Sequence, residues 1–263
     1  MGMDSKARDS FTCDLHGKTA FVTGGSSGIG AHLAGVLAAA GANVVVAARR
    51  EQELATVVAA IEKRGGKAFA VRMDVTDSQS IERGFLAAER EVGVANVLLN
   101  NAGISVVKPA LDVTVEDWDG VISTNLRGPF LVARAFAQRL IAHSSAGSII
   151  NVGSIMGARV AGGLTSYAAA KAGLHHLTRA LALEWARYGI RVNAIAPGYI
   201  MTDMTRDFFS TPPGEAIRKR IPQRCVGELD HLSAPVLLLA SDASAYMTGA
   251  VVPVDGGHLV STL

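Results

Sequence analysis

Three residues of this 263-residue chain have side chain types and a spacing that could move a proton together. Tyr167 and Lys171 stand at positions i and i+4, so on a helix they share one face, and Ser154 precedes them. A free phenol has a pKa of about 10. An ammonium about 4 Å away, at an effective dielectric near 20, would stabilise the phenolate by roughly 4 kcal/mol, or about three pKa units before desolvation is subtracted. We therefore expect Lys171 to bring Tyr167 close to neutrality, where an acid–base catalyst works best.

Ser154 can complete this set. Its hydroxyl can donate a hydrogen bond to the substrate oxygen that Tyr167 protonates, and can hold that oxygen as charge develops during hydride addition. The set fits the reduction of a carbonyl, or the oxidation of a secondary alcohol. Taken singly, each residue has a simpler explanation, because a serine after a strand is usually a turn residue and a Tyr-x-x-x-Lys pair is usually a helix face. Their joint occurrence after a dinucleotide-type turn favours chemistry.

That turn lies near the start of the chain. Three glycines in the pattern G-x-x-x-G-x-G follow an apolar strand and open a helix, where missing side chains let the backbone approach a pyrophosphate at the helix N-terminus. An ordinary Gly/Ser turn into a helix is the alternative. We expect a dinucleotide to contact Gly24, Ser26, Ser27, Gly28, Ile29 and Gly30.

The end of the second strand indicates which dinucleotide is bound. An NAD site would offer a carboxylate to the ribose 2′-hydroxyl about twenty residues after the turn. This chain has Ala48, Arg49 and Arg50 there, and a guanidinium can pair bidentately with a 2′-phosphate. The pattern favours NADP(H), with NAD(H) as the alternative if these arginines are only a solvated helix entry.

Short apolar runs alternate with helical periods along the chain, which predicts βαβ units and a parallel sheet. We expect one α/β Rossmann domain over 15–263, doubly wound with helices on both faces and the strand order 3-2-1-4-5-6-7. The expected strands are 18–23, 43–48, 67–73, 96–99, 148–152, 191–195 and 251–254. The expected helices are 28–40, 51–64, 78–91, 116–142, 166–188 and 231–240. Residues 200–222 break the rhythm and are predicted to form a mobile substrate flap.

Composition excludes several classes of function. Basic residues exceed acidic ones by only two, which gives no field for nucleic acid. Residues 1–14 are polar and predict a flexible tail, and no run reaches membrane-spanning length, so we expect a cytoplasmic protein. Cys13 and Cys225 match neither a redox pair nor a metal site, and the adjacent His175 and His176 point to different helix faces. We expect no metal.

Several motifs in order carry a family resemblance. They are Thr23 to Gly30, Asn100 to Gly103, Asn125, Ser154, the Tyr167-Ala-Ala-Ala-Lys171 segment, Pro197-Gly198 and Asp255 to Gly257. Across roughly residues 15–258 the chain closely resembles the short-chain dehydrogenases/reductases, most of all the 3-oxoacyl-carrier reductases and gluconate 5-dehydrogenases.

The resemblance implies a role for each matching residue. Tyr167 would be the proton donor, Lys171 would also hold the nicotinamide ribose, and Ser154 would orient the carbonyl. Asn125 would bind a water that joins Lys171 to bulk solvent. The cofactor cleft would further include Asp74 and Val75 at the adenine, Asn101, Ala102 and Gly103 along the cleft, and Pro197, Gly198, Ile200 and Thr202 toward the carboxamide. Family members usually pair their long helices between subunits, which implies a homotetramer.

The substrate is expected to be a 3-oxoacyl compound or a keto acid, with a sugar-acid or polyol dehydrogenase using NAD(H) as the alternative. The candidate pocket is mainly apolar and comprises Ser154, Ile155, Met156, Val160, Leu164, Tyr199, Met204, Phe208 and Phe209. Arg159 could bind a carboxylate or lie on the surface. A non-catalytic, dinucleotide-binding regulator is an alternative of another class, but such a protein would be expected to have lost Ser154, Tyr167 or Lys171.

Overall fold

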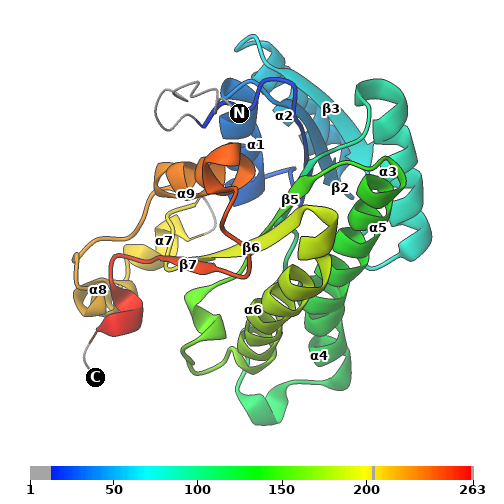
Figure 1. Cartoon of the computed structure of the whole chain (residues 1–263). Coiled ribbons are helices and arrows are strands. Elements are labelled where there is room, and N and C mark those ends of the chain that lie inside the picture. The colour runs from blue at the N-terminus through cyan, green and yellow to red at the C-terminus, as the bar shows by residue number, and fades with distance from the viewer. Residues whose placement is uncertain (1–12, 203–204, 262–263) are drawn as a thin grey trace, which may run out of the picture.

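The chain, described over residues 13–202 and 205–261 by a computed structural model, is built on a seven-stranded parallel sheet (Figure 1). The strands are β1 Thr19–Thr23, β2 Asn43–Ala48, β3 Lys67–Arg72, β4 Val97–Asn100, β5 Gly147–Val152, β6 Ile190–Pro197 and β7 Val251–Val254. Their order is β3-β2-β1-β4-β5-β6-β7, so the predicted order is confirmed. The order reverses between β1 and β4, where open sheets of this kind bind ligands. Residues 1–12 of the predicted tail lie outside the described part of the chain.

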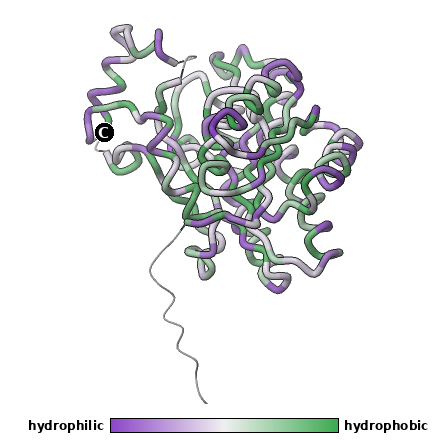
Figure 2. Tube along the Cα trace, turned by 90° about the horizontal axis from the view of Figure 1, so that it is seen from above, coloured by the Kyte–Doolittle hydropathy of each residue, from purple (hydrophilic) through white to green (hydrophobic). Residues whose placement is uncertain are grey.

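Helices cover both faces of the sheet, as expected. They are α1 Gly28–Ala39, α2 Glu51–Glu62, α3 Ser78–Val92, α4 Val115–Ile122, α5 Gly128–Ala142, α6 Thr165–Trp185, α7 Arg206–Phe209, α8 Pro212–Arg220 and α9 Ser233–Ala240. On one face α1, α2 and α9 enclose a core with Leu33, Leu54 and Val236. On the other, α3, α5 and α6 enclose a core with Phe85 and Phe136. Figure 2 shows hydrophilic residues mainly on the outer turns and helix faces.

The buried strands join the two cores. All five residues of β1 are buried, and its middle, Ala20 to Val22, is an apolar run rather than an alternating pattern. Neighbouring side chains point to opposite faces, so Val22 enters the core beside α1 and Phe21 the core beside α3. Phe21 packs on Phe85 with 4.5 Å between ring centroids. These contacts fix the strand whose end carries the glycine-rich turn.

The single helix predicted over 116–142 is wrong, because it is two α-helices joined by a π-helical turn. The turn spans Ser123–Arg127 and contains Asn125, which is fully buried. A capping box of Thr114 and Asp117 starts α4. Such π turns occur frequently at functional sites. The extra residue shifts the helical register, which no hydrophobic period in the sequence reveals.

The segment predicted as a flap contains two helices that the sequence reading missed. Thr211 caps α8, its hydroxyl accepting a hydrogen bond from Gly214 N–H at 3.4 Å, and Pro212 and Pro213 occupy the first helical positions. Proline is favoured there because its missing N–H would have no helical partner. The Pro-Pro-Gly run is therefore a helix start rather than a loop. Whether the segment moves stays a prediction.

Candidate active site

The glycine-rich turn follows β1 and has the shape that a pyrophosphate requires. Gly24 and Gly28 have positive φ angles of 64° and 54°, which side chains rarely adopt. A Cβ on Gly30 would overlap the Gly24 carbonyl and the Asn101 side chain. The turn is thus closed by direct backbone packing, and the N-terminus of α1 faces the end of the sheet.

Asn101 holds this turn from the neighbouring strand. Its Nδ2 donates to the carbonyls of Thr23 and Gly24 at 3.1 Å each, while its backbone N–H donates to the Thr23 hydroxyl at 3.0 Å. Ala102 N–H donates to the same hydroxyl at 3.1 Å. These bonds join the ends of β1 and β4 into one edge. The predicted residues of both segments are therefore brought together.

The two predicted arginines face different partners. Arg50 crosses the glycine-rich turn, and its Nη2 donates to the hydroxyls of Ser26 at 2.9 Å and Ser27 at 2.8 Å. It also pairs with Glu53 at 3.6 Å. Arg49 instead lies close enough to Asp74 for its charge to lower the pKa of that carboxyl. A guanidinium beside two hydroxyls at the end of β2 fits a 2′-phosphate, so this cradle is suited to NADP(H).

Asp74 follows β3 and is rigidly held. Its carboxylate accepts from the N–H of Thr76 at 2.9 Å and its hydroxyl at 2.8 Å. Burial raises the pKa of Asp74, but these bonds and the charges of Arg49 and Arg72 outweigh burial and hold the pKa below its ordinary value. Val75 beside it is buried. An ionised Asp74 therefore stands at the same edge as the turn.

Ser154, Tyr167 and Lys171 meet at the end of β5. Ser154 ends the turn after β5 and accepts a hydrogen bond from Met156 N–H at 3.1 Å, while its hydroxyl also hydrogen-bonds the Tyr167 phenol. Lys171 lies one turn later on α6, is 5 % exposed, and donates to the Val152 carbonyl at 2.8 Å. Its Nζ lies 5.6 Å from the centre of the Tyr167 ring. The three predicted side chains therefore share one site.

The protonation of this group differs from the expectation. Burial, partly offset by the Ser154 hydrogen bond, raises the pKa of the Tyr167 phenol above its ordinary value. Burial also lowers the pKa of Lys171 to about 8. Burial and the Ser154 hydrogen bond are the causes of the Tyr167 shift, and Lys171 is not among them. In this structure Tyr167 is a protonated phenol, and the expected shift toward neutrality is not found.

The ring of His175 packs against the turn that contains Ser154. His175, one turn after Lys171 on α6, is buried against Gly153 and Gly157, and a Cβ on either glycine would overlap its ring. Burial, with the charges of Arg179 and Lys171, lowers the pKa of His175 to about 4. A neutral ring therefore fills this space. Gly153 and Gly157 are the sequence feature from which this packing of His175 could have been predicted.

Asn125 lies in the π turn, which packs against α6. Its Nδ2 donates to the Ile104 carbonyl at 2.8 Å, and its Oδ1 accepts from Ile104 N–H at 2.9 Å. The side chain thereby fixes the segment after Gly103. The predicted water between Asn125 and Lys171 stays a prediction.

The end of β6 supplies the remaining predicted cofactor residues. Gly198 allows close approach of Asp255, since a Cβ there would stand 2.8 Å from the Asp255 Cβ. Ile200 is buried and bridges to Gly227. Thr202 N–H donates to the Thr205 hydroxyl at 2.9 Å. The segment from Pro197 to Thr202 is therefore held by packing and hydrogen bonds at the carboxyl end of the sheet.

A cavity of about 1140 Å³ opens at Met156, two residues after Ser154. Ser154 and Leu164, which were predicted to belong to the substrate pocket, do not line this cavity. Of the predicted pocket residues, Met156, Val160 and Tyr199 line it. Ile155 is buried elsewhere, at 2 % exposure, and Phe208 and Phe209 pack against each other and Tyr199 rather than lining the cavity. Met204 lies outside the described residues. Arg159 lines the cavity as well, together with basic residues of α8 and its following loop that the sequence reading missed.

Over residues 13–202 and 205–261, no group of His, Cys, Asp and Glu side chains could hold a metal ion. In the same residues, no helix is long and apolar enough to cross a membrane.

Comparisons with known proteins place the chain among characterised families. A family model described as enoyl-(acyl carrier protein) reductase matches residues 24–258. The 3β-hydroxysteroid dehydrogenase 1 of Eggerthella lenta is 41 % identical over 93 % of this chain and 94 % of its own length. The 3-oxoacyl-[acyl-carrier-protein] reductase of Pseudomonas aeruginosa is 37 % identical over 94 % of this chain and 99 % of its own.

A solved structure gives the same picture. A gluconate 5-dehydrogenase from Burkholderia cenocepacia, crystallised in complex with NADP and tartrate, is 34 % identical and superposes with a TM-score of 0.91. The match covers 95 % of this chain and 98 % of that one. The strand order of the sheet and these similarities point to the same family. The chain therefore belongs to the short-chain dehydrogenase/reductase family and is an enzyme of that family.

Proposed function

We propose that this enzyme is an NADP(H)-dependent oxidoreductase that reduces a ketone to a secondary alcohol, or catalyses the reverse, with Tyr167 as general acid and base. One observation carries the proposal. Ser154, Tyr167 and Lys171 meet at the end of β5, at the same sheet edge as the glycine-rich turn, and Met156, which hydrogen-bonds Ser154, lines a cavity. A proton donor, an oxygen-binding hydroxyl and a dinucleotide cradle are the parts that carbonyl reduction needs.

The proton step follows from the local environment. NADP(H) would supply or accept the hydride. Because burial raises the pKa of Tyr167, the phenol is protonated at neutral pH and can give its proton to the substrate oxygen. The Ser154 hydroxyl would donate to the same oxygen. Lys171 and Asn125 would return a proton to Tyr167 from solvent through water, as the family resemblance implies.

The choice of NADP(H) rests on Arg50. Its contacts with Ser26 and Ser27 place a guanidinium where a 2′-phosphate would lie. The related gluconate 5-dehydrogenase was solved with NADP. The pyrophosphate would lie on Gly24 to Gly30, with Lys171 at the nicotinamide ribose and Ile200 and Thr202 near the carboxamide.

The substrate class we favour is a 3-oxoacyl compound or a keto acid. The relatives are named for steroid, oxoacyl and gluconate substrates, so their names alone do not choose among these. The cavity lined by Met156 is large enough for a chain of several carbons.

We further propose a cytoplasmic homotetramer. Cys13 and Cys225 are unpaired, which suits a reducing compartment. Exposed apolar side chains remain at the start of α4, where Val115 is 70 % exposed, and on α6, where Leu183 is 84 % exposed, and pairing between subunits would cover them. Light scattering should then give a mass near four times 27.3 kDa.

NADPH oxidation with a panel of carbonyl compounds tests the proposed reaction. The panel comprises oxoacyl thioesters, keto acids of sugars and aromatic ketones, each also run with NADH. Turnover of at least one ketone, faster with NADPH, is expected. If the protein binds NADPH but turns over no ketone and oxidises no secondary alcohol, the proposal fails in favour of a dinucleotide-binding regulator.

A further inference from the structure

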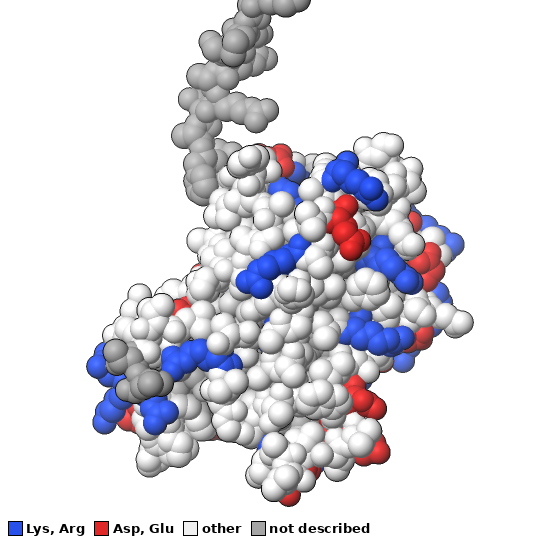
Figure 3. Space-filling view, turned by 60° about the horizontal axis from the view of Figure 1, so that its bottom comes forward, with Lys and Arg blue, Asp and Glu red and all other residues white. Residues whose placement is uncertain are grey.

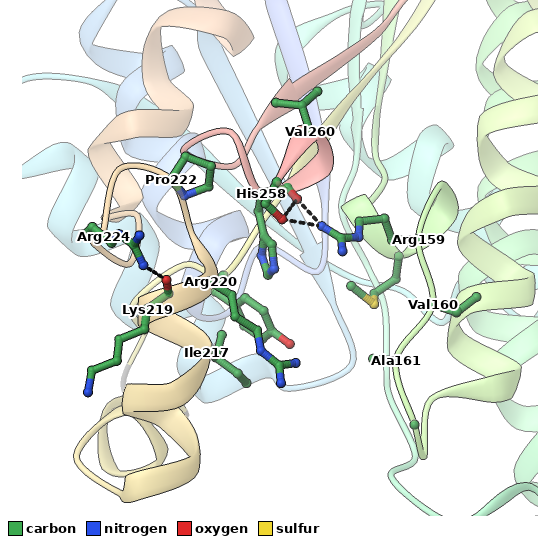
Figure 4. A pocket seen from close by; sticks show the side chains of 14 residues that line it. Arg159, Val160, Ala161, Ile217, Lys219, Arg220, Pro222, Arg224, His258 and Val260 are labelled. Atoms are coloured by element: carbon green, nitrogen blue, oxygen red, sulfur yellow. Dashed lines mark hydrogen bonds between the residues drawn. The ribbon is translucent and has the colours of Figure 1, made fainter. Parts of the chain in front are cut away.

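The cavity lined by Met156 is assembled mainly from three distant parts of the chain, with Tyr199 contributing as well (Figure 4). Residues 156–162 form one wall, α8 and the loop to residue 224 form the second, and residues 258–261 form the third. Met156 connects this cavity to the proposed reaction centre, because its N–H donates to the Ser154 hydroxyl. A molecule whose carbonyl reached Ser154 would extend into this space.

The cavity is strongly basic. Arg159, Lys219, Arg220, Arg224 and His258 line it, and none of its described lining residues is acidic. Figure 3 shows Lys and Arg surface gathered at the lower left, the corner where α8 lies in Figure 1. With a net charge of only +2 on the whole chain, this local excess is a feature of the cavity and not of the average surface.

Two of the cations face the inside. The Arg159 guanidinium donates to the His258 carbonyl and to the Ser261 hydroxyl, the latter at 2.8 Å, through Nη1 alone. Arg220 extends from α8 and its charge acts on Tyr199, whereas the Lys219 amine points away (Figure 4). Within residues 13–202 and 205–261, neither Arg159 nor Arg220 pairs with a carboxylate. Both retain donors for a ligand.

His258 lies between these two arginines. It is 9 % exposed, its ring points into the cavity, and its Nδ1 has no hydrogen-bond partner in the described residues (Figure 4). Burial and the charges of Arg159 and Arg220 lower the pKa of His258, while Asp255 opposes them. The Asp255 carboxylate itself accepts from the N–H groups of Gly257 at 2.9 Å and Leu259 at 2.7 Å. A buried, unpaired ring nitrogen beside two guanidinium groups is an unsatisfied site for an acceptor-rich group.

Most of the remaining lining is apolar, and includes Met156, Ile217, Pro222 and Val260. Such a surface suits a ligand with an apolar middle and an anionic end. A neutral ligand would leave the guanidinium groups desolvated without a partner, which is costly.

We propose that this cavity holds the oxoanion of the carbonyl substrate, a carboxylate or a phosphate, between Arg159 and Arg220 with His258 beside them. The inference rests on the proposed function and deepens it. The ketone lies at Ser154 and Tyr167, and the anionic group lies at the far end of the same molecule. Arg159, Arg220 and His258 therefore select the substrate and take no part in the proton step.

Matched substrate pairs test the assignment. Oxo-octanoic acids with the ketone at C3, C5 or C7 are compared with their methyl esters, which keep the ketone and remove the carboxylate. 3-Oxo-octanoyl-pantetheine is compared with its 4′-phosphate, which distinguishes a phosphate from a carboxylate source. NADPH oxidation gives kcat and KM separately for the wild type, Arg220→Ala, Arg159→Lys and the control Lys219→Ala, which removes an equal charge that points away.

The wild type should favour the anionic member of at least one pair by about tenfold or more in kcat/KM, which is the effect of one charge-assisted hydrogen bond. Arg220→Ala should remove this preference through KM while leaving the neutral member and kcat nearly unchanged, and Lys219→Ala should keep it. Equal use of both members by the wild type, or a preference that survives Arg220→Ala, overturns the inference while carbonyl reduction stands.

A binding measurement distinguishes the proposed anion site from the proposed carbonyl reduction if no turnover is seen. Octanoate is titrated by calorimetry into the NADP⁺-loaded protein and into its Arg220→Ala variant. Saturable binding that the variant loses supports the anion site even when no ketone is reduced, and octanoate binding that is absent or equal in both proteins overturns it. Absence of ketone turnover in the wild type counts only against the proposed reaction.

Discussion

Removing Arg50 should convert the coenzyme preference with little effect on the chemistry. In the structure the Arg50 guanidinium makes two hydrogen bonds, to Ser26 at 2.9 Å and Ser27 at 2.8 Å, at the place where a 2′-phosphate would bind. A hydrogen bond to a charged group contributes about 1.5–3 kcal/mol. The Arg50 side chain is 55 % exposed, so solvent screening favours the low end of that range. We expect Arg50→Ala to raise KM for NADPH by roughly tenfold.

NADH lacks the 2′-phosphate and serves as the internal control. Its kcat/KM should stay within about twofold in Arg50→Ala, because the variant removes a contact that NADH never makes. Arg72→Ala is a matched charge control, since Arg72 lies at the end of the neighbouring strand, is 72 % exposed and pairs with Glu51 at 3.2 Å. The assay is initial-rate kinetics with one ketone and each coenzyme. An unchanged NADPH-to-NADH ratio in Arg50→Ala, or an equal change in Arg72→Ala, would refute phosphate recognition by Arg50.

Three further predictions concern the cradle, the proton and the core. Gly30→Ala should abolish NADPH binding in a fluorescence titration, because its Cβ would overlap the Gly24 carbonyl and the Asn101 side chain; binding within twofold of wild type would contradict this. Alcohol oxidation should accelerate as pH rises through the alkaline range, since burial raises the pKa of Tyr167 and a base must be deprotonated, whereas reduction should be flat near neutrality; an oxidation rate already level at neutral pH would be inconsistent. Phe85→Ala should lower the free energy of unfolding in urea by about 3–5 kcal/mol, because Phe85 is 1 % exposed, and Leu86→Ala, 41 % exposed, should cost far less; equal losses would argue against the packing described.

The sheet order and the dinucleotide turn could be predicted because their signals are local. A buried parallel strand such as β1 has an apolar run at its middle, and Gly24, Gly28 and Gly30 mark the turn that follows. The spacing of Tyr167 and Lys171 likewise fixes one helix face whatever surrounds it. In each case a few neighbouring residues determine the geometry.

What could not be predicted depends on packing between distant segments. The π turn at Asn125 follows from its hydrogen bonds to Ile104, which lies 21 residues earlier. The basic cavity joins Arg159 to α8 and to the last residues described, and no period in the sequence connects them. The predicted pKa of the Tyr167 phenol was wrong for the same reason, because residue spacing identifies Lys171 as a neighbour but does not reveal that Tyr167 is buried.

The central claim is that the Tyr167 phenol gives and takes the proton beside the bound dinucleotide. Tyr167→Phe removes only the hydroxyl and keeps the ring that packs near Lys171. NADPH binding by fluorescence and single-turnover ketone reduction should be measured on the same preparation of this variant. We predict that its dissociation constant for NADPH stays within about twofold and that the rate of reduction falls by 10²-fold or more. Reduction at the wild-type rate with NADPH bound would contradict the account.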